Sequence, residues 1–330
     1  MIVTPLQKFL GFPSFLYSLF IFYWSLPIFS LCHRIKFLKL KGVRNDMLDW
    51  AKTLVAFFNV KIYRFGKQSL YKGDACIYLC NHRSWADFFI DCYLTEGRAA
   101  LMSRWLVYFV FPVFCTSVIL LKGIILFKRG SIADKTKFNE WIDEKRASSN
   151  IPGVIVYPEG HRSMKLKSLP LKRGMLHYAY GRKIPIQIVI SRGKEAIISE
   201  KTMSVLFGST VVFGYSSLIK PTDFEDFESF FSKIQAEWDD LWIQIYSADV
   251  GALTPHVQRR EEEQTYEYDI KTRLGQLMIV LASFVALALN LLAAWWLISS
   301  FFGILLEPLK QVLIASITTW FTISFWRSHV

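Results

Sequence analysis

A histidine and an aspartate five positions apart are the first residues in this chain whose types and spacing could perform chemistry. The segment "LCNHRSWADFF" (79–89) ends an apolar run in His82, and Asp87 follows. A histidine that ordinarily titrates near pH 6.5 can accept a proton from a hydroxyl group, and a neighbouring carboxylate can orient its ring. The two residues therefore have the composition of a general base and its partner.

Local geometry sets where these two side chains must lie if they are to meet. On one continuous helix, residues i and i+5 are about 140° apart and do not face each other. Contact therefore requires His82 in a loop and Asp87 in the first turn of a helix, for which Ser84 would be the N-cap. The same placement makes Asp87 the far half of a capping box. These residues alone leave a catalytic role and a purely capping role open.

A metal site is a further alternative for the same segment. Cys76, Cys80 and His82 are residue types that bind zinc. On a predicted strand, however, Cys76 and Cys80 lie about 13 Å apart, too far to share one ion. We therefore expect no metal site here.

Short apolar segments alternate with helical patterns through the middle of the chain. The predicted strands are 60–65, 75–80, 123–128, 153–158, 184–190 and 210–215. The predicted helices are 46–58, 84–96, 104–119, 131–147, 171–181 and 223–246. This alternation predicts an α/β fold with a largely parallel mixed sheet flanked by helices.

Polar residues follow three of the predicted strands at their carboxyl ends. His82 follows the first, Arg129 follows the second, and "PEGHRS" (158–163) follows the third. Ligands of open α/β sheets bind at the carboxyl ends of the strands. If these strands are parallel, the sequence predicts one site at this edge of the sheet.

Four further segments are informative because of their order along the chain. They are "NHRSWAD" (81–87), "GIILFKR" (123–129), "PEGHRS" (158–163) and "KIPIQIVI" (183–190). In this order they resemble the motif blocks of the glycerolipid acyltransferases, the family that includes the 1-acyl-glycerol-3-phosphate acyltransferases. The resemblance covers about residues 45–220, and the HxxxxD motif followed by EGxRS is its specific part. The chain departs from the family at His161, where threonine is common.

The resemblance implies transfer of an acyl group from acyl-CoA to the free hydroxyl of lysophosphatidic acid, giving phosphatidic acid. Glycerol-3-phosphate or another lysophospholipid is the alternative acceptor. In this mechanism His82 is the general base, Asp87 orients its ring, and no covalent acyl-enzyme forms. Acyl-CoA is a co-substrate, and no cofactor is expected.

The resemblance also implies roles for the polar residues at the other strand ends. Arg129 and Arg162 would hold the phosphate of the acceptor. Gly160 would allow close approach of the backbone, and Glu159 would bind glycerol hydroxyls or fix the arginines. Ser163 completes the substrate-binding block.

A basic stretch after this block, which includes Lys172 and Arg173, would contact coenzyme A or anionic headgroups. A solvated charged face is an equally good reading of this stretch.

The longest uncharged stretches lie near the C-terminus. Residues 277–306 carry no charge, and this length exceeds the roughly 20 residues that a helix needs to span a bilayer. A second uncharged run, 312–326, is short for a span but suits the return arm of a hairpin.

The N-terminus holds another apolar stretch, 9–31, interrupted by Pro13 and Pro27. We expect a membrane anchor, spanning or re-entrant. A secretory signal peptide is the alternative, although only Lys8 precedes the run and no A-x-A site follows it. Basic residues flank both apolar regions on the side of the chain's middle, which favours a cytoplasmic placement of that middle.

Four parts follow from these boundaries. They are an N-terminal membrane anchor with its basic flank (1–44), an α/β acyltransferase domain (45–250), a charged linker (251–273) and a C-terminal transmembrane hairpin (274–330). The apolar segment 104–121 is either a third span or a helical segment that packs on the sheet and dips into the bilayer. We expect an integral membrane protein of the endoplasmic reticulum with its catalytic domain facing the cytoplasm.

Composition narrows the class of partner. The net charge is +12 and 52% of the residues are apolar, which together indicate anionic lipid or a phosphorylated substrate rather than nucleic acid. A nucleic-acid-binding protein would carry a basic face without membrane spans. A non-catalytic membrane scaffold would have no need for His82, Asp87 and the EGxRS residues together. The five cysteines show no CxxC spacing, so a reducing compartment fits better than a disulfide framework.

Overall fold

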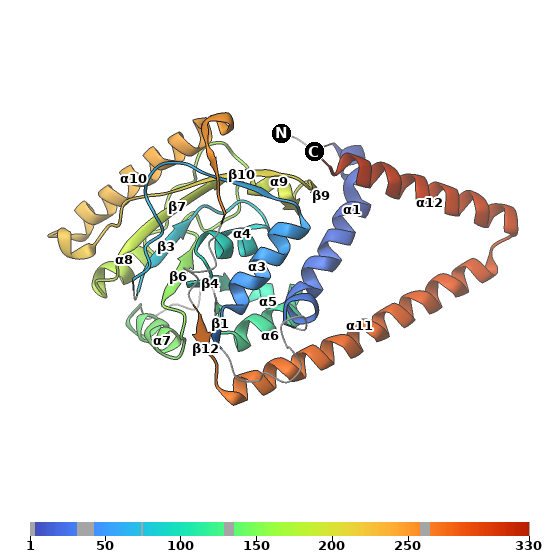
Figure 1. The fold of residues 1–330 in the computed structure, drawn as a ribbon, viewed down its shortest axis with the longest axis horizontal. Helices are drawn as coiled ribbons and strands as arrows, with labels where there is room; N and C mark the ends of the chain where they lie inside the picture. The colour runs from blue at the N-terminus through green and yellow to red at the C-terminus, as the bar shows by residue number, and fades with distance from the viewer. Residues whose placement is uncertain (1–3, 32–42, 74, 129–134, 258–264, 330) are drawn as a thin grey trace.

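The structure is a computed structural model that describes residues 4–31, 43–73, 75–128, 135–257 and 265–329. An eight-stranded mixed sheet forms its centre, and helices cover both faces. Two long helices, α11 and α12, project away from this body and return to it (Figure 1). The predicted class, a largely parallel mixed sheet with helical flanks and apolar terminal helices, is confirmed.

The strands of the large sheet are arranged in the order β11-β2-β10-β7-β3-β6-β4-β5. Their bounds are β2 Lys61–Arg64, β3 Ile77–Cys80, β4 Ala99–Arg104, β5 Ile124–Phe127, β6 Gly153–Val156, β7 Ile186–Arg192, β10 Thr210–Tyr215 and β11 Thr254–Pro255. The run from β7 to β5 is parallel throughout, whereas β10 pairs with β7 in the antiparallel sense. Strands β7, β3 and β6 are therefore parallel neighbours whose carboxyl ends meet at one edge.

Strand β4 was not among the predicted strands. Its first four residues, "AALM", are helix formers and include no β-branched side chain, so local propensity gives no strand signal. The strand forms because it pairs with β6 on one side and β5 on the other, and residues 99–102 are buried between them. Tertiary pairing overrides the local preference here.

Helices divide between the two faces of the sheet. The face of Tyr78 and Cys80 is covered by α1, α3 (Asp46–Phe57), α4 (Asp87–Leu94) and α6 (Pro112–Leu120). The opposite face, that of Ile77 and Leu79, is covered by α7 (Lys135–Ala147), α8 (Gly174–Gly181) and α10 (Phe227–Ser247). Alternate residues of β3 thus enter separate cores, as expected for a central strand.

The single helix predicted over 104–119 is in fact two. Helix α5 (Leu106–Val110) ends at Phe111, whose φ of −131° and ψ of 62° are not helical, and α6 begins at Pro112. Proline disfavours the helical conformation in the residue before it, which explains the break. Residues 105, 106, 109 and 110 are exposed and apolar or aromatic.

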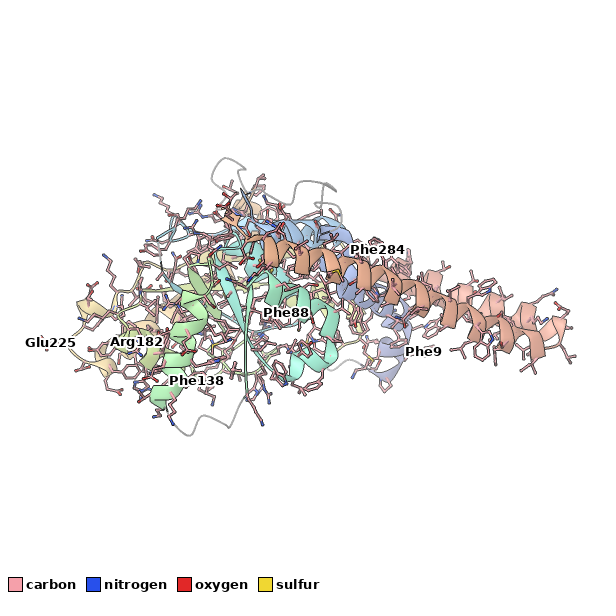
Figure 2. All side chains as sticks on the ribbon, turned by 90° about the horizontal axis from the view of Figure 1, so that it is seen from below. Phe9, Phe88, Phe138, Arg182, Glu225 and Phe284 are labelled. Atoms are coloured by element: carbon pink, nitrogen blue, oxygen red, sulfur yellow. The ribbon has the colours of Figure 1, made fainter. Side chains whose placement is uncertain are left out.

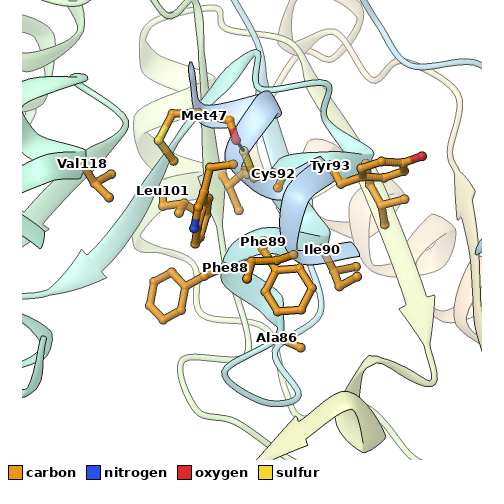
Figure 3. Close-up of a cluster of buried hydrophobic side chains, with 14 of the residues drawn as sticks. Met47, Ala86, Phe88, Phe89, Ile90, Cys92, Tyr93, Leu101 and Val118 are labelled. Carbon is orange, nitrogen blue, oxygen red and sulfur yellow. Dashed lines mark hydrogen bonds between the residues drawn. The ribbon is translucent and has the colours of Figure 1, made fainter. Parts of the chain in front are cut away.

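Helix α4 is the element that must hold Asp87. Its Phe89, Ile90 and Cys92 are buried, and Figure 3 shows them gathered with Met47 of α3 and Leu101 of β4. With both ends of this short helix inside the core, its N-terminus has a fixed position beside the carboxyl end of β3.

The N-terminal anchor is helix α1 (Pro5–Trp24), which continues as a π-helix, η1 (Ser25–Leu31). Among the described residues, two helical stretches are long and apolar enough to cross a bilayer: Pro5–Ile28, whose most apolar part is partly buried within the protein, and Ile270–Ile304 (α11), whose most apolar part is largely exposed. The basic residues predicted to flank the N-terminal anchor fall largely in 32–42, outside the described residues.

The C-terminal arm forms a hairpin. Helix α11 runs outward and α12 (Glu307–Arg327) returns, with both projecting far from the α/β body (Figures 1 and 2). The return helix packs on α1, where Trp320 stacks on Phe9 with ring centroids 4.5 Å apart. Beyond it, the backbone N–H of Phe207 donates to the carbonyl of Ser328 at 2.6 Å. The end of the hairpin therefore contacts the α/β domain.

The described parts of the predicted linker, 251–257 and 265–273, contact the domain at several points. Strand β11 joins the large sheet, and β12 (Tyr266–Glu267) pairs with β1 (Val43–Arg44). The Tyr266 hydroxyl donates to the carbonyl of Gly97 at 3.2 Å. At the start of α11, buried Arg273 pairs with buried Asp46 at 2.9 Å. Aromatic residues between the charges explain why this stretch packs rather than extends.

Candidate active site

His82 and Asp87 are in direct contact at the carboxyl end of β3. The Nδ1 atom of His82 lies 2.6 Å from Oδ2 of Asp87. The same carboxylate oxygen accepts the backbone N–H groups of Arg83 at 2.6 Å and Ser84 at 3.1 Å. Because an ionised carboxylate can only accept, Nδ1 carries the ring proton and Nε2 has a free lone pair.

The capping geometry differs from the prediction. Helix α4 begins at Asp87, with Ala86 as an N-cap that makes no side-chain bond, so Ser84 is not the N-cap. Its hydroxyl instead accepts the N–H of Ala86 at 3.1 Å and donates to the carbonyl of Lys194 at 3.0 Å. Asp87 nevertheless binds both the loop backbone and the histidine, so the two roles left open by the sequence coexist in one carboxylate.

The His82 ring is partly accessible, and its partner is not. The exposed fraction of the side chain is 21% for His82 and 1% for Asp87. One face of the ring stacks on Tyr157, with centroids 4.2 Å apart and an interplanar angle of 18°. Among the described residues Nε2 has no hydrogen-bonding partner, so this nitrogen is available to a ligand.

The Glu159 side chain is buried, and both of its carboxylate oxygens already accept hydrogen bonds. Its Oε2 accepts the backbone N–H of His82 at 2.9 Å, and its Oε1 accepts the N–H of Leu169 at 3.0 Å and the hydroxyl of Ser168 at 3.5 Å. The sequence suggested that this side chain would bind glycerol hydroxyls or fix the arginines. The structure shows a different use, because the carboxylate holds the backbone of His82 to the loop after β6.

The rest of the "PEGHRS" segment also contacts the histidine. The N–H of Ser163 donates to the carbonyl of His82 at 3.0 Å. Gly160 has a φ of +71°, a left-handed conformation that glycine adopts without strain, and it makes the turn between these contacts. His82 is therefore held through its N–H by Glu159 and through its carbonyl by Ser163.

The predicted phosphate-binding arginines are only partly described. Arg162 is partly exposed and pairs with Glu200 at 2.9 Å. Arg129 and the rest of 129–134 lie outside the described residues. Strand β5, which precedes Arg129, is separated from β6 by β4, so Arg129 follows a strand two places from the one that precedes Arg162.

The basic residues after this block face different neighbours. Lys172 is exposed, and its backbone N–H donates to the carbonyl of Pro158 at 2.7 Å. Arg173 pairs with Glu228 of α10, and its guanidinium lies 4.4 Å from the centre of the Phe231 ring. The structure thus attaches Arg173 to α10 rather than to His82.

The sequence patterns did not single out Lys194, whose ammonium lies beside the Asp87 carboxylate. This lysine is fully buried, and its Nζ lies 2.8 Å from Oδ1 of Asp91, 2.7 Å from the carbonyl oxygen of Asn81 and 3.4 Å from Oδ1 of Asp87. A signal was present in the sequence: Asp87 and Asp91 are four residues apart, which places two carboxylates on one face of a buried helix and calls for a nearby cation.

The charged groups in this cluster shift one another's pKa values. Burial works against the ionised form of Asp87, but the Lys194 ammonium and the His82 contact outweigh it and hold the pKa of Asp87 below its ordinary value. Burial raises the pKa of Asp91 to about 7 against the opposing effect of Lys194. Burial also opposes the charge of Lys194, yet Asp87 and Asp91 raise the pKa of its ammonium above the ordinary value. We infer that Asp87 is ionised and Lys194 protonated at neutral pH.

The residue types that bind metal ions are dispersed in the described part of the chain. There, no three His, Cys, Asp or Glu side chains are grouped so that they could hold a metal ion. Cys76 and Cys80 are both buried free thiols in the core on one face of β3.

The similarity of this chain to known proteins lies in the domain that holds this site. A protein-family model described as Acyltransferase matches residues 61–191, which include both the HxxxxD and the EGxRS segments. With the fold described above, this match supports the resemblance to the glycerolipid acyltransferases that the motifs predicted.

Two individual proteins illustrate the relationship. The 1-acyl-sn-glycerol-3-phosphate acyltransferase of Cocos nucifera is 24% identical over 159 residues, which are 48% of this chain and 50% of that protein. The chain thus matches about half the length of this relative. The crystal structure of the 1-acyl-sn-glycerophosphate (LPA) acyltransferase PlsC from Thermotoga maritima matches with a TM-score of 0.57 and 16% identity, over 74% of this chain and 99% of that one. At this identity the likeness concerns the fold alone.

The contacts of Glu159 give a prediction about stability. In the isosteric variant Glu159→Gln, the amide nitrogen is a donor and must face one of three other donors. We expect the free energy of unfolding to fall by about 1–3 kcal/mol, the cost of a buried group left without its partner. Denaturant unfolding in detergent measures it. Glu144→Gln on the exposed side of α7 is the control, and equal stability of the two variants would contradict the assignment.

Proposed function

We propose that this protein transfers an acyl group from acyl-CoA to the free hydroxyl of lysophosphatidic acid, which gives phosphatidic acid. The observation that carries the proposal is the contact between His82 and buried Asp87, which leaves Nε2 of His82 free at the accessible side of the ring. The EGxRS loop binds the backbone of the same histidine. The Cocos nucifera relative, whose name states this activity, is similar to this chain over half of the relative's length.

In the proposed mechanism, His82 is the general base. Nε2 takes the proton of the acceptor hydroxyl as that oxygen attacks the thioester carbonyl of acyl-CoA. The C–S bond then breaks, the thiol leaves as free coenzyme A after taking up the proton, and no acyl-enzyme forms. Asp87 fixes the ring through Nδ1 and stabilises the imidazolium during the reaction. Tyr157 limits the ring to one plane by stacking on its face.

Arginine side chains would bind the phosphate of the acceptor. Arg162 is the arginine of the EGxRS loop that holds His82, and its partial exposure lets a ligand reach it. Its pairing with Glu200 orients the guanidinium and must be shared or exchanged when a phosphate binds. Arg129 is proposed as the second phosphate ligand, and the exposed Lys172 as a contact for coenzyme A or a lipid headgroup, with Arg173 further along the same surface.

A panel of acceptors tests this function. The purified protein in detergent micelles, given one acyl-CoA, should acylate lysophosphatidic acid in preference to glycerol-3-phosphate, lysophosphatidylcholine and lysophosphatidylethanolamine. Arg162→Ala should raise the KM for lysophosphatidic acid roughly tenfold to a hundredfold, as expected for loss of a charge-assisted contact, with a smaller change for acyl-CoA.

The control for this panel is Arg182→Ala, which removes an arginine that pairs with Asp143 at the far end of α8. Arg162→Lys should also be impaired, because an ammonium cannot make a bidentate contact. Equal rates with all acceptors, or acylation of none, would contradict the proposed function.

The surface of the hairpin supports a membrane location for the enzyme. Along α11 the exposed side chains include large apolar residues: Met278, Leu281, Phe284, Val285, Leu289, Leu291, Leu292, Trp295, Trp296, Leu297, Ile298 and Phe301. Exposing such an apolar surface to water is unfavourable, whereas its contact with lipid is favourable. A helix of this length, about 52 Å, exceeds the hydrocarbon thickness of about 30 Å.

We propose that the active site faces the cytoplasm of the endoplasmic reticulum, close to the bilayer surface. Basic residues lie on the domain side of α11, which favours the cytoplasm for that side. The contact between Ser328 and Phe207 brings the end of the hairpin back to the catalytic domain. A lysolipid could then enter laterally while its phosphate stays at the interface, so that no charge need cross hydrocarbon.

Protease protection of intact microsomes tests this topology. Tags inserted near Glu262 and after Val330 should both be cleaved by protease added from the cytoplasmic side, because the hairpin returns the chain to its starting side. A protected tag near Glu262 would place the active site in the lumen and contradict the proposal. Protection of the C-terminal tag alone would replace the hairpin with a single span.

A further inference from the structure

The segment that follows β7, "SRGKE" (191–195), folds back along the HxxxxD loop. Ser191 exchanges hydrogen bonds with the Asn81 side chain: its N–H donates to Oδ1 at 3.0 Å, and its carbonyl accepts Nδ2–H at 2.8 Å. The Arg83 guanidinium lies 3.2 Å from Oε1 of Glu195. The Ser84 hydroxyl donates to the carbonyl of Lys194. Three of the first four residues of the loop, Asn81, Arg83 and Ser84, thus contact this segment, and His82 does not.

The turn at Gly193 directs the next residue inward. Gly193 has a φ of +91°, and a Cβ at this position would lie 2.0 Å from the carbonyl oxygen of Thr210. Glu195 closes the turn by accepting the N–H of Gly193 at 3.0 Å. Only glycine fits this conformation and this approach. Lys194 then enters helix α9 (Lys194–Ile197) with its side chain in the core.

A fully buried ammonium needs compensating partners, because its desolvation is costly. Lys194 has three within 3 Å: both oxygens of Asp91 and the carbonyl of Asn81. Its fourth neighbour is Oδ1 of Asp87 at 3.4 Å, whereas His82 binds Oδ2 of the same carboxylate. The Asp87 carboxylate is therefore held between the histidine ring on one side and the ammonium on the other.

Charge in this cluster bears on the proposed reaction. With His82 neutral, the two carboxylates and one ammonium sum to at most one negative charge, and the imidazolium formed in the transition state neutralises it. Without Lys194, two buried carboxylates would face each other across one turn of helix, and like charges at such distances cannot both remain ionised. Asp87 would then cease to be a purely accepting, fixed partner of the ring.

We propose that Lys194 is a positioning residue for acyl transfer, which fixes the Asp87 carboxylate in its ionised form and through it the His82 ring, so that "SRGKE" is part of the catalytic unit. This inference rests on the proposed function, but it concerns residues that none of the family's four motif blocks contains.

A comparison between two variants separates this positioning role from an effect on folding stability. Lys194→Met alone would leave Asp91 buried without a partner and can fail to fold. Replacing both partners with apolar residues of similar shape is often nearly neutral for stability. We therefore compare Asp91→Leu with the double variant Lys194→Met/Asp91→Leu. Both lack Asp91, so they differ only in whether an ammonium faces Asp87.

The double variant should remain folded, with a thermal midpoint within a few degrees of Asp91→Leu. Its kcat for phosphatidic acid formation should be lower by about tenfold or more, because the partner of the His82 ring is no longer held, with the KM of both substrates little changed. The acid limb of its kcat profile should move to higher pH, because removal of a buried cation lets the neighbouring groups keep a proton to higher pH.

Other charged and titratable groups that face this cluster remain in both variants. They are Cys80 of β3, Arg83 of the loop, Tyr157 and Glu159 after β6, and Glu195 of α9. A merely structural role for Lys194 would lower the thermal midpoint without moving the acid limb. Identical kcat values and identical acid limbs in the two variants would overturn the proposal.

A second measurement does not depend on turnover. Diethyl pyrocarbonate modifies neutral histidine, and peptide mass spectrometry reports modification of His82 as a function of pH. Because a nearby ammonium disfavours a second positive charge, its loss should let the His82 ring keep a proton, and so resist modification, to higher pH in the double variant than in Asp91→Leu. Equal midpoints would refute the role of Lys194. If the wild-type chain made no phosphatidic acid, the proposed function would fail, whereas the labelling result would still decide the role of Lys194.

Discussion

The Asp87 carboxylate is where the separate parts of the site meet. Its Oδ2 receives the His82 ring and two backbone N–H groups of the following loop, and its Oδ1 faces the Lys194 ammonium. A buried carboxylate is stable only when such donors and charges surround it. The loop between β3 and α4 therefore has little freedom, because displacing it would leave this charge without partners. The position of His82 follows from that constraint.

Sheet topology explains how the partners come together. Strand β3 lies between β6 and β7, and all three are parallel, so their following loops leave the sheet at one edge. The loop after β6 brings Glu159 and Ser163 to the backbone of His82. The loop after β7 brings Lys194 to the back of Asp87. One central strand with two parallel neighbours thus supplies the histidine and both of its supports.

Sequence patterns were sufficient for the parts of this arrangement that local chemistry encodes. Residue spacing predicted the apolar strands that became β3, β6 and β7. Helix geometry stated where His82 and Asp87 must lie in order to meet, and the resemblance of the motifs to a known family favoured their pairing. Strand β4 was not predicted, because its alanine-rich sequence prefers a helix and only its two neighbours make it a strand. Lys194 was missed for a related reason: a lysine beside a glycine resembles a solvated turn, and only the tertiary fold places it against Asp91. The contact of Glu159 with the backbone of His82 joins residues 77 positions apart, which residue spacing alone does not reveal.

The most direct test of this account compares phosphatidic acid formation by Asp87→Asn and His82→Ala with that of the wild-type protein and of His177→Ala, an exposed histidine on α8. Asp87→Asn keeps the shape of the side chain but removes the charge that fixes the ring. We expect folded proteins whose kcat falls by roughly a thousandfold or more for both site variants and little for His177→Ala. Near wild-type turnover in either folded site variant would contradict the central role of the His82–Asp87 contact.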